Sequence, residues 1–241
     1  MSKKKILITG STNGIGNQLT NYYLDKGHKV LGVDRNENRN IKKNFNYEQM
    51  IVDITNAKKI EDFLNTLKKK NELPDIFILN AGINIYDNDD YFNLDNFKKC
   101  FDINFYGVFS FISFIEKNNL SGKKILFISS ISIIIPNPKS LAYYSSKLLL
   151  KKLTPFLKNK NDYKVAILGP IRTDISRNIN KPSGLANLIY KILVIEKSGL
   201  CNKLDKFLIG KGKKFYYPKK SFLVYNLILF FLYFFPFLYK G

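Results

Sequence analysis

Short apolar runs alternate with amphipathic stretches along most of this chain, and this alternation restricts its fold more than any other feature. Helix-like stretches with apolar residues at helical spacing cover residues 57–69 and 94–117. Strand-like runs lie at residues 5–9, 29–33, 49–52, 75–79, 124–128 and 164–168. The pattern predicts an α/β fold with a doubly wound parallel sheet, formed by a single domain over residues 1–210.

The ends of the predicted strands should lie together. Right-handed crossovers place the carboxyl ends of parallel strands along one edge, where such sheets bind ligands. The residues expected at this edge are Gly10, Asp34, Asp53, Asn80, Ser130 and Gly169.

A glycine-rich loop follows the first run and leads into a helical pattern. The loop reads Gly10-Ser11-Thr12-Asn13-Gly14-Ile15-Gly16. Its glycines allow a tight turn and close backbone approach, and the helix N-terminus after it attracts a pyrophosphate. Strand, glycine loop and helix are the context that a dinucleotide-binding site requires.

An acidic residue ends the second run. Asp34 stands 18 residues after Gly16, where a carboxylate can hold both ribose hydroxyls of the adenosine and repel a 2′-phosphate. We therefore expect NAD(H) as cofactor. Arg35 is adjacent and could accept that phosphate, so NADP(H) is the alternative.

A serine, a tyrosine and a lysine follow the fifth run. Tyr143 comes 13 residues after Ser130, and Lys147 comes four residues after Tyr143. On a helix, that last spacing puts phenol and ammonium on one face, where the ammonium is expected to lower the pKa of Tyr143. Such a tyrosine can act as general acid or base. Ser129 and Ser132 are alternatives to Ser130.

The formal net charge of +20 raises the question of an anionic partner. Of the 39 basic residues, 35 are lysines, whereas nucleic-acid sites favour arginine. We interpret the charge as a solvated surface and expect no nucleic-acid partner. Two cysteines without a metal-like cluster, and no recognised export signal, indicate a reducing, cytoplasmic compartment.

Taken in order, these motifs resemble the short-chain dehydrogenase/reductase family, in its compact branch, over roughly residues 4–210. The resemblance rests on the glycine loop and on further motifs, namely Asp53, Asn80-Ala81-Gly82, Asn104, Ser130, Tyr143-x-x-x-Lys147 and Gly169-Pro170-Ile171-x-Thr173.

The resemblance implies a Rossmann-type fold and assigns roles to the matching positions. Tyr143 would be the proton donor or acceptor, Lys147 would hold the nicotinamide ribose, and Ser130 would orient the substrate oxygen. Asn104 would position a water of the relay through its backbone. The remaining implied cofactor contacts are Asp53 and Ile54 at the adenine, Ile171 and Thr173 at the carboxamide, and the motifs around Ala81, Gly82 and Pro170.

The implied activity is interconversion of a secondary alcohol and a ketone with NAD or NADP. The same fold acting on a sugar or nucleotide-sugar is an alternative, as is a non-catalytic cofactor-sensing or membrane-scaffold protein. The non-catalytic alternative is disfavoured because the set of Asn104, Ser130, Tyr143 and Lys147 is complete. The resemblance also implies a homodimer formed by the helices over residues 97–117 and 143–158.

The C-terminal segment, residues 211–241, departs from the family pattern. A basic stretch precedes 18 uncharged, mostly apolar residues, 222–239, interrupted near their end by Pro236. Three interpretations are open: a lid or dimer contact, a helix in the interface of a cytoplasmic membrane face, or a membrane span of marginal length.

Overall fold

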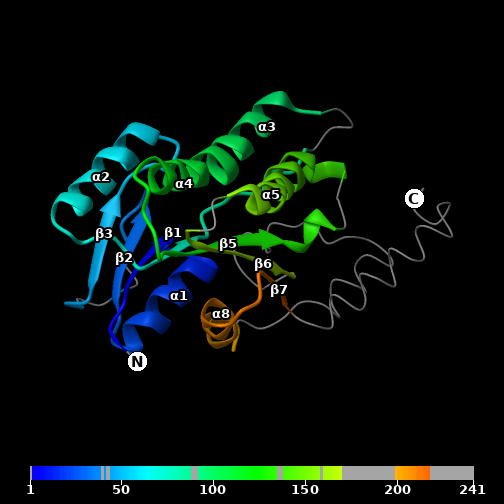
Figure 1. The fold of residues 1–241 in the computed structure, drawn as a ribbon. Coiled ribbons are helices and arrows are strands. Elements are labelled where there is room, and N and C mark those ends of the chain that lie inside the picture. The colour runs from blue at the N-terminus through cyan, green and yellow to red at the C-terminus, as the bar shows by residue number, and fades with distance from the viewer. Residues whose placement is uncertain are drawn as a thin grey trace.

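The computed structural model describes residues 2–38, 41, 44–87, 92–134, 138–157, 160–169 and 199–217. Within them, strands alternate with helices and form one parallel sheet, in the order β3-β2-β1-β4-β5-β6-β7 (Figure 1). The strands are β1 (Lys5–Thr9), β2 (Lys29–Asp34), β3 (Tyr47–Ile51), β4 (Ile76–Leu79), β5 (Lys124–Ser130), β6 (Asp162–Leu168) and β7 (Lys214–Tyr217). The predicted doubly wound α/β sheet is confirmed.

Helices cover both faces of the sheet. Figure 1 shows α1 (Gly14–Asp25) and α8 (Leu200–Ile209) on one face. The opposite face carries α2 (Ala57–Lys69), α3 (Leu94–Phe101), α4 (Val108–Lys117) and α5 (Leu141–Leu153). Asn56 and Asn93 cap α2 and α3, because their side chains accept hydrogen bonds from backbone N–H groups of the first turn.

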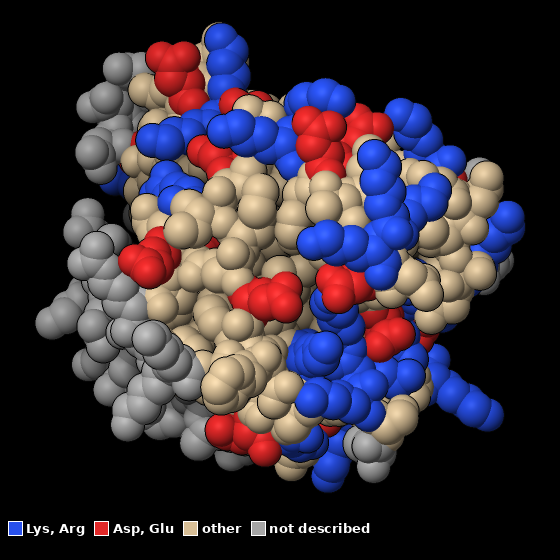
Figure 2. Space-filling view, turned by 90° about the vertical axis from the view of Figure 1, so that its left-hand side faces the viewer, with Lys and Arg blue, Asp and Glu red and all other residues tan. Residues whose placement is uncertain are grey.

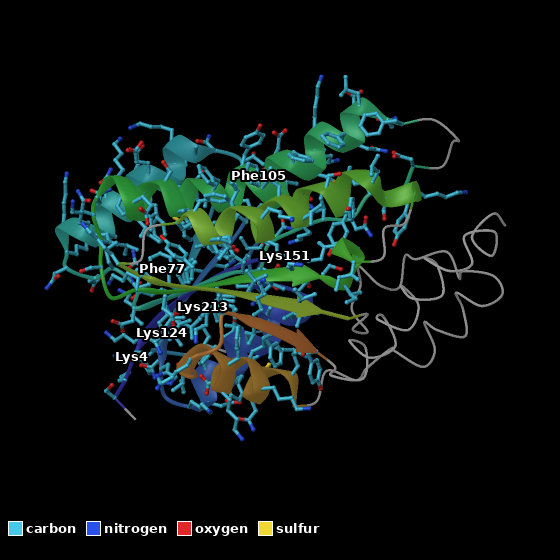
Figure 3. The ribbon with its side chains drawn as sticks, turned by 45° about the vertical axis from the view of Figure 1, so that its right-hand side comes forward. Lys4, Phe77, Phe105, Lys124, Lys151 and Lys213 are labelled. Carbon is cyan, nitrogen blue, oxygen red and sulfur yellow. The ribbon has the colours of Figure 1, made fainter. Side chains whose placement is uncertain are left out.

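Two apolar layers follow from strand alternation. Successive strand residues point to opposite faces, so Leu7 joins the core beneath α2 to α5, whereas Ile6 and Ile8 join the core beneath α1 and α8. Figure 3 shows Phe77 of the sheet and Phe105 of the helical layer, which belong to the first of these cores. Burial on both faces explains why the central strands read as continuous apolar runs.

The strand boundaries differ in part from the sequence prediction. β1 has the predicted bounds, whereas β3 begins two residues earlier and β5 extends through both serines to Ser130. β7 was not predicted as a strand. It lies in the segment that the sequence analysis separated at residue 210, and it pairs with β6 from Val165 and Lys214 to Leu168 and Tyr217.

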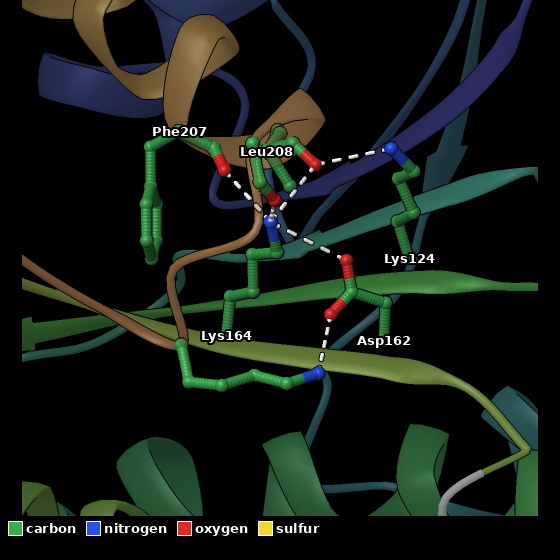
Figure 4. Close-up of polar contacts among 7 residues, drawn as sticks. Lys124, Asp162, Lys164, Phe207 and Leu208 are labelled. Atoms are coloured by element: carbon green, nitrogen blue, oxygen red, sulfur yellow. Dashed lines mark hydrogen bonds and ion pairs between the residues drawn. The ribbon is translucent and has the colours of Figure 1, made fainter.

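A buried lysine ties α8 to the sheet (Figure 4). Lys164 on β6 has no exposed surface, and its Nζ donates to the backbone oxygens of Phe207 at 2.8 Å, Leu208 at 3.2 Å and Gly210. Asp162 lies 3.3 Å from the same Nζ. A helix ends with unpaired carbonyls and a partial negative charge. The lysine donates hydrogen bonds to these carbonyls and neutralises the charge, so it stabilises the end of α8 just before β7.

Charged side chains are mixed on the face drawn in Figure 2. Groups of Lys and Arg alternate there with Asp and Glu. Several lysines are ion-paired at the surface, among them Lys58 with Asp62 at 2.9 Å and Lys117 with Glu61 at 3.0 Å. This arrangement fits the interpretation of the net charge as a solvated surface.

Candidate active site

The glycine loop joins β1 to the N-terminus of α1. Gly10 and Gly14 have positive φ angles, +67° and +55°, which favour glycine. Gly16 has no room for a side chain, since a Cβ there would lie 1.9 Å from the backbone oxygen of Gly10. Asn13, the residue before α1, makes no side-chain cap. Among the described residues, no side chain therefore caps the first turn of α1, which leaves its backbone N–H groups to an anion.

The loop after β4 holds the glycine loop in place. Thr9 Oγ1 accepts hydrogen bonds from the backbone N atoms of Asn80 and Ala81, both at 3.0 Å. Asn80 Nδ2 donates to the backbone oxygens of Thr9 at 3.1 Å and Gly10 at 3.3 Å. The predicted Asn80-Ala81-Gly82 motif thus lies against the start of the glycine loop.

Asp34 ends β2 next to that loop. Its Oδ2 accepts from the backbone N of Thr12 at 3.1 Å and from Thr12 Oγ1 at 2.8 Å, while Arg35 is exposed. Asn38 also belongs to this corner: it is 7% exposed, and its Nδ2 donates to Ser11 O at 2.9 Å. Sequence reasoning missed Asn38, because only the folding back of the chain after β2 brings it to Ser11.

Asp53 and Ile54 follow β3 at the same edge. Asp53 is exposed, and its Oδ1 accepts from the backbone N of Thr55 at 2.9 Å. Ile54 is buried and packs against Gly107, where a Cβ would lie 2.8 Å from Ile54 Cγ1. The polar residue thus faces solvent, and the apolar one secures the turn.

Asn104 lies in a π-helical turn, η1 (Asp102–Gly107), between α3 and α4. Its side chain is fully buried and forms a two-way link with Ile83: Ile83 N donates to Oδ1 at 2.7 Å, and Nδ2 donates to Ile83 O at 2.9 Å. The predicted helix over 94–117 is therefore interrupted by a π turn at Asn104, the residue to which a function was assigned. Such π turns are frequent at functional sites.

Ser130, Tyr143 and Lys147 meet where β5 ends beneath α5. The Ser130 hydroxyl lies near enough to the Tyr143 phenol to lower its pKa. Lys147 Nζ lies 5.9 Å from the centre of the Tyr143 ring and donates to Ile128 O at 3.1 Å. A Cβ on Gly82 would lie 3.0 Å from both Lys147 Nζ and Asn104 Oδ1, so these two groups border the same glycine.

The three candidate serines differ in the contacts that they make. Ser129 is 3% exposed, and its Oγ has no hydrogen-bond partner among the residues described. Ser132 uses its backbone N, which donates to Ser130 Oγ at 3.2 Å. Ser130 is therefore the serine in contact with Tyr143.

Burial sets the pKa values at this site. Burial raises the pKa of Tyr143 to about 12, and the hydrogen bond with Ser130 opposes that rise only in part. Burial likewise lowers the pKa of Lys147 to about 8. The Tyr143 pKa was expected to be lowered by Lys147, and in this arrangement it is raised, because the loss of solvation on burial dominates.

Two further observations complete the account of the predicted residues. Gly169 follows β6, and its backbone N donates to Tyr217 O at 2.7 Å. Pro170, Ile171 and Thr173 lie outside the described residues. Ser146, which sequence reasoning missed, links Asn104 to α5; its position inside Tyr143-x-x-x-Lys147 was the available signal.

A family profile described as short chain dehydrogenase matches residues 4–184. An uncharacterised oxidoreductase of Schizosaccharomyces pombe is 27% identical over 164 residues, which are 65% of this chain and 55% of that protein. An uncharacterised oxidoreductase of Saccharomyces cerevisiae is 27% identical over 196 residues, 77% of each chain. The match thus spans little more than half the length of the first relative.

Solved structures share the fold. A 4-hydroxyisoleucine dehydrogenase complexed with NADH superposes with a TM-score of 0.74, covers 89% of this chain and 96% of its own, and is 24% identical in sequence. At that identity, the similarity concerns the arrangement of the sheet and helices.

Proposed function

Because the chain belongs to the short-chain dehydrogenase family, we propose that it is an NAD(P)-dependent oxidoreductase that interconverts a secondary alcohol and a ketone. One observation carries the proposal: Asn104, Ser130, Tyr143 and Lys147 lie at the carboxyl edge of the sheet, where Lys147 Nζ is 5.9 Å from the Tyr143 ring centre and borders Gly82 together with Asn104. They come from a π turn, a strand end and a helix that lie apart in the sequence.

The cofactor cradle fits a dinucleotide. A Cβ at Gly16 would collide with the loop backbone, and the first turn of α1 has no side-chain cap, so a pyrophosphate could approach backbone N–H groups. The pyrophosphate would be held by the glycine loop, which consists of Gly10, Ser11, Thr12, Asn13, Gly14, Ile15 and Gly16. Asp34 would hold the adenosine ribose, Asp53 and Ile54 would border the adenine, and Lys147 would hold the nicotinamide ribose.

The chemistry divides between cofactor and protein. When bound, the nicotinamide supplies or accepts the hydride at the substrate carbon. Ser130 orients the substrate oxygen, and Tyr143 gives that oxygen a proton in reduction or removes one in oxidation. With a pKa near 12, Tyr143 is protonated at neutral pH and so is prepared to act as the acid in ketone reduction.

The cofactor preference we propose is NAD(H), with NADP(H) as the alternative. Asp34 supports it, because its carboxylate is fixed by Thr12 beside the glycine loop and would repel a 2′-phosphate. Arg35 supports the alternative, since it is exposed next to Asp34.

We also propose a homodimer through the helical layer of α3 to α5. Large apolar side chains stay exposed there, including Tyr106 at 59%, Phe109 at 37% and Leu141 at 40%. Phe109 stacks on Phe105 with ring centres 5.7 Å apart, which extends the apolar surface along one face. A second copy of the chain would cover it.

The membrane proposal concerns the end of the chain. No helix in the described ranges is both long and apolar enough to cross a bilayer. The uncharged run over residues 222–239 lies outside those ranges and follows lysines, a combination suited to the anionic cytoplasmic face of a membrane. We propose attachment to that surface by the segment after β7, with a lid or dimer contact as the alternative.

One variant tests the chemistry. A panel of ketones and secondary alcohols is screened for NADH or NADPH oxidation and for NAD⁺ or NADP⁺ reduction. Tyr143→Phe keeps the ring and removes the transferable proton, so we expect turnover to fall by about 10²–10⁴-fold. Cofactor affinity, measured by fluorescence titration, should be retained. Near-normal turnover in a folded Tyr143→Phe protein would contradict the proposal.

A further inference from the structure

Ser146 lies on α5 between Tyr143 and Lys147, and its hydroxyl connects α5 to the π turn. Its Oγ donates to the backbone oxygen of Tyr143 at 2.9 Å and accepts a hydrogen bond from Asn104 Nδ2 at 3.1 Å. Ser146 and Asn104 each have 0% exposed surface. Water is therefore a poor substitute partner for either group, and losing one leaves the other unsatisfied.

The hydrogen-bond roles in this network are all assigned. A serine hydroxyl has one proton, and Ser146 gives it to Tyr143 O, so its oxygen can only accept from Asn104. The Asn104 amide uses both Nδ2 protons, on Ser146 Oγ and Ile83 O, and its Oδ1 accepts from Ile83 N. A flipped amide would place Oδ1 against two acceptors. Ser146 thus helps to fix the orientation of Asn104.

The position of Asn104 matters for Lys147. Asn104 Oδ1 and Lys147 Nζ would each lie 3.0 Å from a Cβ on Gly82, so both groups border the same small space. A shift of Asn104 by a few tenths of an ångström would change the space beside the ammonium. The chain Tyr143 O, Ser146 Oγ, Asn104 and Ile83 therefore couples the start of α5 to the loop after β4.

We infer that Ser146 is a positioning residue of the proton relay: it holds Asn104, and the π turn around it, in register with Tyr143 and Lys147. The inference rests on the proposed oxidoreductase function. Ser146 has no surface from which to reach a substrate or cofactor, so its effect would pass through Asn104.

The test is a double-mutant cycle on the full-length protein. Ser146→Ala, Asn104→Ala and the double variant are assayed for NADH oxidation with benzil, an activated diketone, and with the best compound from the ketone panel. Ser146→Thr keeps the hydroxyl. Ser145→Ala is the matched control, because Ser145 precedes Ser146 on α5 and makes no side-chain hydrogen bond within the described chain.

We expect Ser146→Ala to lower kcat about tenfold while the KM values for NADH and ketone change less than about twofold, since the loss concerns the chemical step. Ser146→Thr should recover most of the activity, and Ser145→Ala should match the wild type. The double variant should be no slower than Asn104→Ala alone, because both substitutions remove one linked unit.

Several results would overturn the inference. Additive losses in the double variant would show that Ser146 does not act through Asn104. Wild-type kcat in Ser146→Ala would remove the role altogether, and a Ser146→Thr variant as slow as Ser146→Ala would indicate packing alone. Lack of turnover by the wild type across the whole panel would instead contradict the proposed function, and the inference would fall with it.

Discussion

Thr12 donates two hydrogen bonds to one carboxylate oxygen of Asp34, from its backbone N at 3.1 Å and from its Oγ1 at 2.8 Å. Among the described residues, the other oxygen, Oδ1, has only a long contact of 3.4 Å, from Asn36 N. The glycine loop thus sets the orientation of the carboxylate at the end of β2 and leaves Oδ1 the freer of its two oxygens.

This relationship predicts cofactor selectivity. The wild type should have the higher kcat/KM with NADH, and Asp34→Ser should shift the NADH to NADPH ratio toward NADPH by about 10–100-fold, or about 1.4–2.8 kcal/mol. Thr12→Val keeps the backbone contact and should shift the NADH to NADPH ratio less than Asp34→Ser does. Steady-state kinetics with both cofactors decide the matter. A wild-type preference for NADPH would mean that Arg35 dominates.

The lowered pKa of Lys147 predicts how stability depends on pH. Its pKa is about 8 in the folded protein, against an ordinary value of 10.5, so the unfolded chain binds more protons between these values. Stability should therefore rise with pH across that window. Relative to that of Lys147→Met, the unfolding free energy of the wild type should increase by up to about 3 kcal/mol across this pH window. Chemical denaturation of both proteins at pH 7.5, 9 and 10 measures the difference; a constant or falling difference would contradict it.

The Lys164 contact predicts a large stability loss on substitution. Lys164→Met removes the cation from the carbonyls of Phe207 and Gly210, while Leu208 O keeps Lys124, and should cost roughly 3 kcal/mol of unfolding free energy. For a chain of this size, Tm should fall by about 6–12 °C. Lys213→Met is the control: Lys213 pairs with the same Asp162 at 2.7 Å but is 65% exposed, so its loss should cost less than about 1 kcal/mol. Equal losses would contradict the special role of the buried lysine.

The exposed apolar face predicts how the chain assembles. We expect a dimer by light scattering at micromolar concentration, and Tyr106→Lys on the π turn should yield a monomer, because it places a charge in the proposed interface. Ile209→Lys is the control, since Ile209 is 53% exposed on α8, across the sheet. A wild-type monomer, with detergent and without it, would rule the dimer out.

The membrane proposal is tested by truncation after Tyr217, which ends β7 and so preserves the sheet. The shortened protein should stop sedimenting with anionic vesicles while keeping its Tm and its activity on a water-soluble ketone. A drop in Tm or activity would favour a lid or dimer contact. Failure of the full-length protein to bind such vesicles at low salt would exclude attachment.

Sequence reasoning worked best where local pattern and burial agree. β1, buried on both faces, has the predicted bounds, whereas β3 at the sheet edge is only partly buried and its bounds were shifted. β7 was missed because its partners are brought to it only by the fold: it pairs with β6, about 50 residues earlier in the chain, and Phe215 stacks on Phe207 of α8. No spacing rule reveals such a partner.

The candidate site shows the same division. The Tyr143 and Lys147 spacing was sufficient to place both residues on one helix face, but the pKa of Tyr143 depends on burial, which spacing does not report. Ser146 was missed because its partner, Asn104, stands 42 residues earlier in the chain. Contacts of this kind depend on how α5 packs against the π turn.

The parallel direction of β7 has a consequence for how substrate reaches the enzyme. In the register of the sheet, Ser130, Leu168 and Tyr217 form one row, so the chain leaves β7 at the edge that carries the proposed relay. Under the proposed membrane attachment, the domain would be tethered to the lipid surface at the edge that carries the proposed relay. A ketone dissolved in that surface would then arrive by lateral diffusion, and its concentration per unit area, more than its concentration in water, would set the rate of encounter.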